Sequence, residues 1–117
     1  MSEPVHVLVV DDNPRMVALV ERWLVRAGYR VTGATSVQEA LQALTAQPFD
    51  WVIADLRLPM GDGFDILACA RAHQPQARVV IMTAFGSEVI RQRALAQGAY
   101  AFLSKPFSGE ALLDVLT

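Results

Sequence analysis

Five short runs rich in apolar and β-branched residues alternate with helical stretches along the 117 residues, and this alternation constrains the fold most. The runs are typical of buried strands and lie at residues 6–10, 30–34, 51–54, 79–83 and 101–104. The predicted helices occupy residues 14–27, 37–46, 64–73 and 88–97, and a last one opens at Gly109. Strands that alternate with helices form a parallel sheet covered on both faces. We therefore predict an α/β fold with a doubly wound, five-stranded sheet flanked by five helices.

Capping residues mark the ends of these helices. Asn13 precedes Pro14, which suits the first position of a helix, and Ser36 with Glu39 has the pattern of a capping box. The remaining capping residues are Ser87 and Ser108 at N-termini and Gly28 and Gly98 after C-termini. The capping residues thus support the predicted ends of the first, second, fourth and last helices.

Composition limits the class of protein. Hydrophobic residues make up 53% of the chain, enough for one domain with a core on both faces of a sheet. A net charge of −2 without a basic patch argues against direct nucleic-acid binding. The single cysteine, Cys69, excludes an internal disulfide. The N-terminus is polar and no apolar run approaches the ~20 residues of a membrane span, so we expect a soluble, cytoplasmic domain without membrane contact.

Two adjacent carboxylates, Asp11 and Asp12, follow the first predicted strand in the stretch HVLVVDDNP. Their mutual repulsion is roughly 1 kcal/mol at 4 Å in bulk water and larger at a lower dielectric. A bound cation would offset it, and so would exposure to water. This stretch alone leaves both explanations open.

Polar residues also close three other apolar runs. WVIAD ends at Asp55, VVIMT ends at Thr83, and AFLSKP carries Lys105. The carboxyl ends of parallel strands share one edge of the sheet, where such folds place their sites. Each residue alone has an ordinary structural explanation, as a cap, a satisfied hydroxyl or a solvated lysine. Together, three carboxylates suit a divalent cation such as Mg²⁺, and a hydroxyl with an ammonium suits a phosphoryl group, which a carboxylate could accept.

The chain resembles the bacterial two-component response regulator receiver domains along essentially its full length. The motifs that carry the resemblance are VLVVDD, DLRLPMGDGFDIL, IMTAFGS and GAYAFLSKPF, in this order and spacing. The resemblance implies a flavodoxin-like sheet of strand order 2-1-3-4-5, an arrangement illustrated by a chemotaxis member of the same family. It also implies that Asp55 is the phosphoacceptor, and that Asp11 and Asp12 bind Mg²⁺ with Asp55 and the backbone carbonyl of Arg57.

The same resemblance assigns roles around the phosphoryl group. Thr83 and Lys105 would each bond a phosphoryl oxygen, and Thr83 would move with Phe102, at the family's aromatic switch position. Phe102 also suits an ordinary core aromatic. The Lys105–Pro106 peptide bond matches one that is usually cis in the family, although cis is the minor form of peptide bonds before proline in general.

The positions two residues after Asp55 and Thr83 control water access to the phosphoryl group in this family. They are Arg57 and Phe85 here. Neither side chain is a carboxylate or an amide that could orient an attacking water. We therefore expect a long-lived phosphorylated state.

The implied partners are a sensor histidine kinase or phosphotransfer protein and an output domain. Phosphorylation would alter the surface of the fourth helix, fifth strand and fifth helix, which is also the expected homodimer face. Residues 1–117 would be the N-terminal receiver domain of a longer regulator, with a transcriptional output suggested by motifs that resemble nitrogen-regulation-type activators. The domain would catalyse its own phosphorylation and dephosphorylation without being a conventional enzyme.

Two alternatives belong to other classes. A haloacid-dehalogenase-like phosphatase also forms an aspartyl phosphate, but it has a second acid where this chain has Arg57, and it has a cap domain. A pseudo-receiver would be a phosphate-independent interaction module, which the complete set of acceptor-site residues disfavours. Labelling by acetyl phosphate that depends on Mg²⁺ would separate a receiver from a pseudo-receiver.

Overall fold

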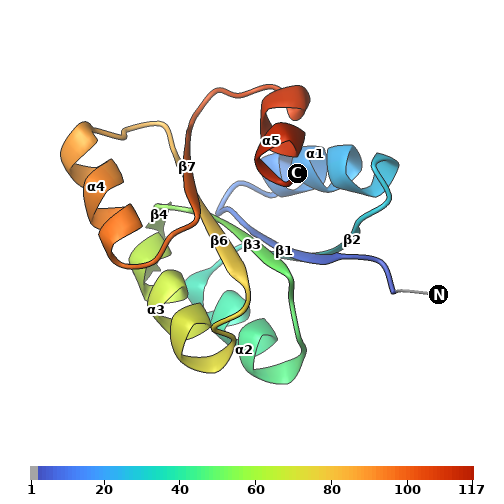
Figure 1. The fold of residues 1–117 in the computed structure, drawn as a ribbon, viewed down its shortest axis with the longest axis horizontal. Helices are drawn as coiled ribbons and strands as arrows, with labels where there is room; N and C mark the ends of the chain where they lie inside the picture. The colour runs from blue at the N-terminus through green and yellow to red at the C-terminus, as the bar shows by residue number, and fades with distance from the viewer. Residues whose placement is uncertain (1–2) are drawn as a thin grey trace.

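The computed structural model describes residues 3–117 and contains a parallel sheet of five strands between two layers of helices (Figure 1). The strands of this sheet are β1 (His6–Val10), β2 (Arg30–Ala34), β3 (Trp51–Asp55), β6 (Arg78–Thr83) and β7 (Ala101–Ser104). Their order is β2-β1-β3-β6-β7, and every neighbouring pair is parallel. Numbered among themselves these strands have the order 2-1-3-4-5, so the predicted doubly wound, flavodoxin-like topology is confirmed.

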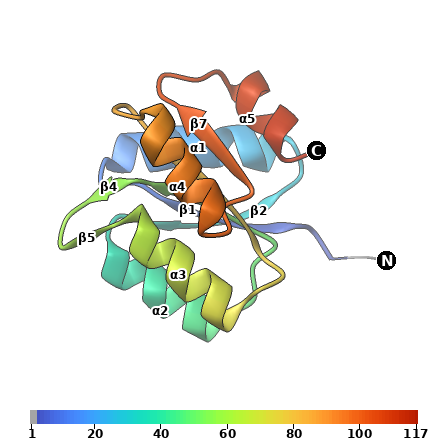
Figure 2. The same cartoon turned by 60° about the vertical axis from the view of Figure 1, so that its left-hand side comes forward.

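Five helices cover the two faces of the sheet (Figures 1 and 2). They are α1 (Pro14–Arg26), α2 (Val37–Ala46), α3 (Gly63–His73), α4 (Glu88–Ala96) and α5 (Gly109–Val115). Alternate residues of β1 point to opposite faces: Val7 and Val9 pack with α1 and α5, and Leu8 and Val10 pack with α2 and α3. This period of two gives each face of the sheet its own hydrophobic core. None of the helices described is long and apolar enough to cross a membrane.

The predicted N-caps are in place, with one correction. The side chain of Asn13 accepts a hydrogen bond from the Arg15 amide, and Ser36 accepts one from the Glu39 amide. The reciprocal half of the predicted capping box is wrong, because the Glu39 carboxylate accepts from the amide and the hydroxyl of Thr35, both at 2.8 Å. Since both donors of Thr35 point at this carboxylate, they hold Glu39 one residue further back than a capping box requires.

A short hairpin after β3 was not predicted from the sequence. Its strands are β4 (Arg57–Leu58) and β5 (Gly61–Asp62), and they pair antiparallel before α3 begins. A Cβ atom on Gly63, the first residue of α3, would lie 2.7 Å from the carbonyl oxygen of Asp55. The glycine therefore lets the start of α3 approach the end of β3, which fixes the hairpin and Arg57 beside Asp55.

The buried amide of Gln74 ties three segments together behind the sheet. Its Oε1 accepts a hydrogen bond of 2.7 Å from the Phe49 amide, just before β3. Its Nε2 donates to the carbonyl oxygens of Leu44 and Gln47 at the end of α2, both at 2.7 Å. The side-chain amide of Gln74 thereby pairs one backbone N–H group and two backbone carbonyl groups that would otherwise be buried without a hydrogen bond.

Candidate functional site

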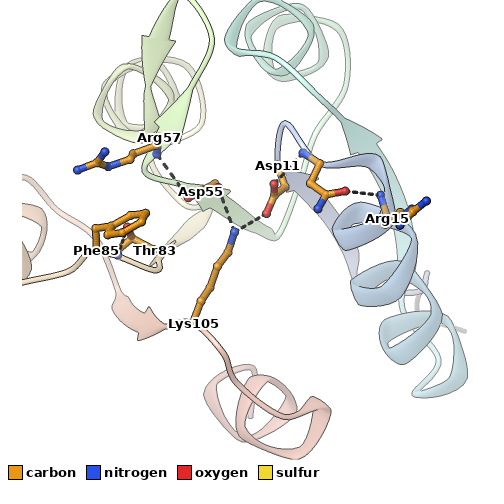
Figure 3. Close-up of polar contacts among 8 residues, drawn as sticks. Asp11, Arg15, Asp55, Arg57, Thr83, Phe85 and Lys105 are labelled. Carbon is orange, nitrogen blue, oxygen red and sulfur yellow. Dashed lines mark hydrogen bonds and ion pairs between the residues drawn. The ribbon is translucent and has the colours of Figure 1, made fainter.

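Four polar side chains from four segments meet at the carboxyl edge of the sheet (Figure 3). Asp11 directly follows β1, Asp55 ends β3, Thr83 ends β6 and Lys105 follows β7. Each lies at the end of a strand or just beyond it, where the apolar run gives way to polar residues. The structure thus brings together the residues that the sequence placed at separate strand ends.

The Lys105 ammonium lies between two carboxylates. Its Nζ is 2.7 Å from Oδ2 of Asp11 and 3.0 Å from Oδ2 of Asp55. Asp11 is 1% exposed and Asp55 is 7% exposed. The other oxygen of Asp11 accepts the Asn13 amide at 2.9 Å, and that of Asp55 accepts the Arg57 amide at 3.4 Å. Each carboxylate is therefore held by the Lys105 ammonium at one oxygen and by a backbone amide at the other.

Burial and charge act in opposite directions on these groups. Burial raises the pKa of the Asp55 carboxyl above its ordinary value, and the hydrogen bond and charge of Lys105 only partly oppose this. Burial also disfavours the Lys105 ammonium, but its hydrogen bonds with Asp11 and Asp55 and their charges outweigh this and raise its pKa. Lys105 is consequently a fixed positive charge at neutral pH.

Asp12 completes an acidic cluster with Asp11 and Asp55. One carboxylate oxygen from each residue lies within 4.8 Å of the others, and Asp12 is exposed while the other two are buried. Lys105 offsets only one of three negative charges, so the cluster keeps an excess that a cation would neutralise. Hard carboxylate oxygens in this number, with one side open to water, fit Mg²⁺.

Thr83 has a hydroxyl with a proton to offer. The side chain is 1% exposed, and its Oγ1 accepts a hydrogen bond of 3.1 Å from the Phe85 amide. Since the oxygen is already an acceptor, its own hydrogen remains available for a group bound near Asp55.

Arg57 and Phe85 stack beside the acidic cluster (Figure 3). The guanidinium carbon of Arg57 lies 4.6 Å from the centre of the Phe85 ring, although that ring is 65% exposed. The sequence singled out both residues but gave no sign that they touch. The hairpin after β3 makes the contact possible, because it turns Arg57 toward the loop that follows β6.

The remaining two sequence-derived features lie close by. Phe102 is half-buried in β7 and packs against the core beneath α2, α3 and α4. The Lys105–Pro106 peptide bond is cis, as the resemblance implied.

A doubly wound sheet with an acidic cluster and a paired lysine at its carboxyl edge defines a class of α/β domain built to handle phosphoryl groups. Comparison with known sequences gives the family: the model of the response regulator receiver domain matches residues 7–117. The chain belongs to this receiver domain family.

Curated relatives agree with this assignment. The chain is 38% identical over 114 residues to the transcriptional regulatory protein GlrR of Escherichia coli strain K12, a match that covers 97% of this chain and 26% of GlrR. It is 39% identical over 99 residues to the response regulator protein PilR of Pseudomonas aeruginosa, covering 85% of this chain and 22% of PilR. The chain thus spans about a quarter of the length of these relatives.

Solved structures share the fold. A CheY-like receiver domain protein from Methanospirillum hungatei superposes with a TM-score of 0.93 at 25% identity, covering 97% of this chain and 91% of the other. The chemotaxis protein CheY4 of Vibrio cholerae gives 0.91 at 32% identity, covering 97% of both chains. A Burkholderia pseudomallei response regulator, solved with a phosphorylated aspartic acid and a calcium ion, gives 0.91 at 33% identity, covering 97% of this chain and 66% of the other.

Proposed function

We propose that this domain accepts a phosphoryl group on Asp55 from a sensor histidine kinase or phosphotransfer protein and thereby controls an output domain. The observation that carries the proposal is the Lys105 ammonium, held 3.0 Å from Asp55 and 2.7 Å from Asp11 at the carboxyl edge of the sheet. A fixed cation beside a buried carboxylate is suited to oxygens that gain negative charge during transfer.

The transfer exchanges one bond to phosphorus for another. An oxygen of Asp55 forms a bond to phosphorus while the bond from phosphorus to the donor histidine nitrogen breaks, and the electron pair leaves with the imidazole. Lys105 and the Thr83 hydroxyl bind phosphoryl oxygens. Asp11, Asp12, Asp55 and the backbone carbonyl of Arg57 would hold Mg²⁺, which neutralises charge on the carboxylates and the phosphoryl group. The domain supplies this catalysis itself and is not a conventional enzyme.

The output signal begins at Thr83. Its hydroxyl now accepts the Phe85 amide at 3.1 Å, and a shift toward the phosphoryl group breaks that bond and moves the loop after β6. The Phe102 ring, whose end already lies beside the Thr83 methyl group, then moves further into the space that Thr83 leaves. Because β7 pairs with β6 and lies beside α4, these shifts alter the surface of α4, β7 and α5. That surface is the proposed contact for an output domain or for a second copy of the chain.

Arg57 and Phe85 set the lifetime of the phosphorylated state. Hydrolysis needs a water in line with phosphorus, and the stacked pair stands beside the site with neither a carboxylate nor an amide to orient that water. The pair therefore slows the loss of the phosphoryl group.

The wider context follows from the relatives. We infer that residues 1–117 are the N-terminal receiver domain of a longer, cytoplasmic regulator with a transcriptional output. In support, GlrR is named a transcriptional regulatory protein and the match covers 26% of it.

Acetyl phosphate with Mg²⁺ tests the proposal, with intact-mass spectrometry as the readout. The parent should gain one phosphoryl group, Asp55→Asn should gain none, and the matched variant Asp50→Asn, an exposed acid before the same strand, should behave as the parent. No labelling of the parent would indicate a phosphate-independent module. Multiple turnover of a phosphomonoester by the parent would indicate a phosphatase.

A further inference from the structure

Gly86, in the loop between β6 and α4, lies directly against the Phe102 ring. A Cβ atom on Gly86 would be 2.7 Å from Cζ and 2.8 Å from Cε1 of Phe102, and 3.1 Å from the Thr83 methyl carbon. The first two distances are shorter than the closest approach of two non-bonded carbon atoms. An alanine at position 86 would therefore overlap the ring where it now lies.

The backbone does not explain this glycine. The glycines with positive φ among residues 3–117 are Gly28, Gly61 and Gly98, and Gly86 is not one of them. Its conformation is accessible to any residue, so the conformational freedom of glycine is not what the position needs. What the position needs is the space that a side chain would fill.

That space belongs to a ring at the centre of the proposed switch. Phe102 pairs with Ile81 across β6 and β7, is half-buried, and packs against the same core as Ile90 of α4. The end of its ring and the Thr83 methyl group both face the same point above Gly86. Gly86 thus leaves room for the Phe102 ring at the point where the ring meets the Thr83 methyl group.

We propose that Gly86 is a positioning residue that forms the seat of the inward Phe102 ring and so couples Thr83 to the α4–β7 surface. This inference rests on the switch described under the proposed function and deepens it. The clashing atoms are the far end of a side chain with other staggered rotamers, so an alanine at position 86 turns the ring outward and leaves the backbone in place.

The effect on activation follows from linkage. A ligand that prefers the inward ring loses affinity when a substitution disfavours that state, by at most its own preference for it. Beryllofluoride, a phosphoryl mimic, should therefore bind Gly86→Ala about fivefold or more weakly than the parent in the presence of Mg²⁺. At saturation it should still shift amide resonances at Asp55, but it should no longer shift those of α4 and β7.

A double-mutant cycle with Phe102→Leu distinguishes a clash between the added methyl group and the Phe102 ring from a general destabilisation by Gly86→Ala. Leucine has no Cζ or Cε1, so it does not reach the added methyl group. Gly86→Ala should lower Tm in the parent and raise it or leave it unchanged in Phe102→Leu, because alanine restricts the unfolded chain at an accessible φ. The NOE between the Phe102 ring and the Thr83 methyl should be present in the parent and absent in Gly86→Ala.

Two results would refute the claim that Gly86 makes room for the Phe102 ring. One is an equal effect of Gly86→Ala on Tm in both backgrounds, and the other is an NOE that persists in Gly86→Ala. A lost NOE with full α4 and β7 shifts on beryllofluoride would overturn the coupling. Failure of beryllofluoride to bind the parent would instead overturn the proposed function, while the cycle and the NOE would still decide on the seat.

Discussion

Replacing Lys105 with methionine probes the charge balance of the site. Methionine keeps the length of the apolar stem but removes the ammonium that lies 2.7 Å and 3.0 Å from two buried carboxylates. At an effective dielectric of about 20, Coulomb's law gives roughly 5 to 6 kcal/mol for each contact. Desolvation of the charged groups offsets much of this, and breaking such a buried arrangement costs about 3 kcal/mol net. We expect Lys105→Met to lower the free energy of unfolding by about that amount at pH 7 without Mg²⁺.

The stability deficit of Lys105→Met should depend on pH, because Asp55 titrates. Burial already raises the pKa of Asp55, and removal of Lys105 takes away the largest opposing effects, its hydrogen bond and its charge. A carboxyl whose pKa is higher in the folded state than in the unfolded state destabilises the fold as pH rises through the folded value. The deficit of Lys105→Met relative to the parent should therefore be smallest at acidic pH, where Asp55 is protonated, and grow toward neutral pH.

Urea denaturation at several pH values measures the deficit. Added Mg²⁺ should recover part of the lost stability, because it replaces the missing positive charge, and Lys105→Arg is the control that keeps the charge. A variant as stable as the parent at pH 7, or a deficit that does not change with pH, would refute the electrostatic account.

Three further predictions concern the metal, the scaffold and the lifetime. Asp12→Ala should weaken Mg²⁺ binding in a titration yet raise Tm without metal, since it removes one of three clustered charges; a lower metal-free Tm would contradict this. Gln74→Leu should lower the free energy of unfolding by about 3 kcal/mol in urea, because it leaves three backbone groups unpaired, and a loss under about 1 kcal/mol would argue that water replaces the amide. The double variant Arg57→Asn with Phe85→Glu should lose its phosphoryl group faster than the parent after donor removal; an equal decay would show that this pair does not set the lifetime.

The sheet and the site edge were predictable because they depend on signals that recur along the chain. Each buried strand needs an apolar run, and each run ends in a polar residue at the carboxyl end of its strand, so the positions of Asp55 and Thr83 follow from the runs themselves. The parallel order then brings the ends together without any information on side-chain contacts.

The hairpin after β3 could not be predicted in this way. Its strands have two residues each, too few to show a period, and Met60 between them takes a positive φ of 61° that its residue type does not announce. The capping box of α3 was missed for a related reason, since Asp62 pairs with an aspartate, Asp65, where the usual pattern has glutamate or glutamine.

Contacts between distant side chains were also beyond the sequence. The stacking of Arg57 on Phe85 depends on the hairpin, and the contact of Gly86 with Phe102 depends on how closely two segments approach. Both contacts depend on three-dimensional packing, and no repeating pattern in the sequence indicates them.

The most direct test of the central claim is to locate the phosphoryl group chemically. The protein is treated with acetyl phosphate and Mg²⁺, the acyl phosphate is reduced with borohydride, which converts the modified aspartate to homoserine, and the peptides are sequenced by mass spectrometry. The account predicts homoserine at position 55 alone, and only when both donor and Mg²⁺ are present. Homoserine at position 11 or 12 instead, or equal conversion of position 55 without Mg²⁺, would contradict it.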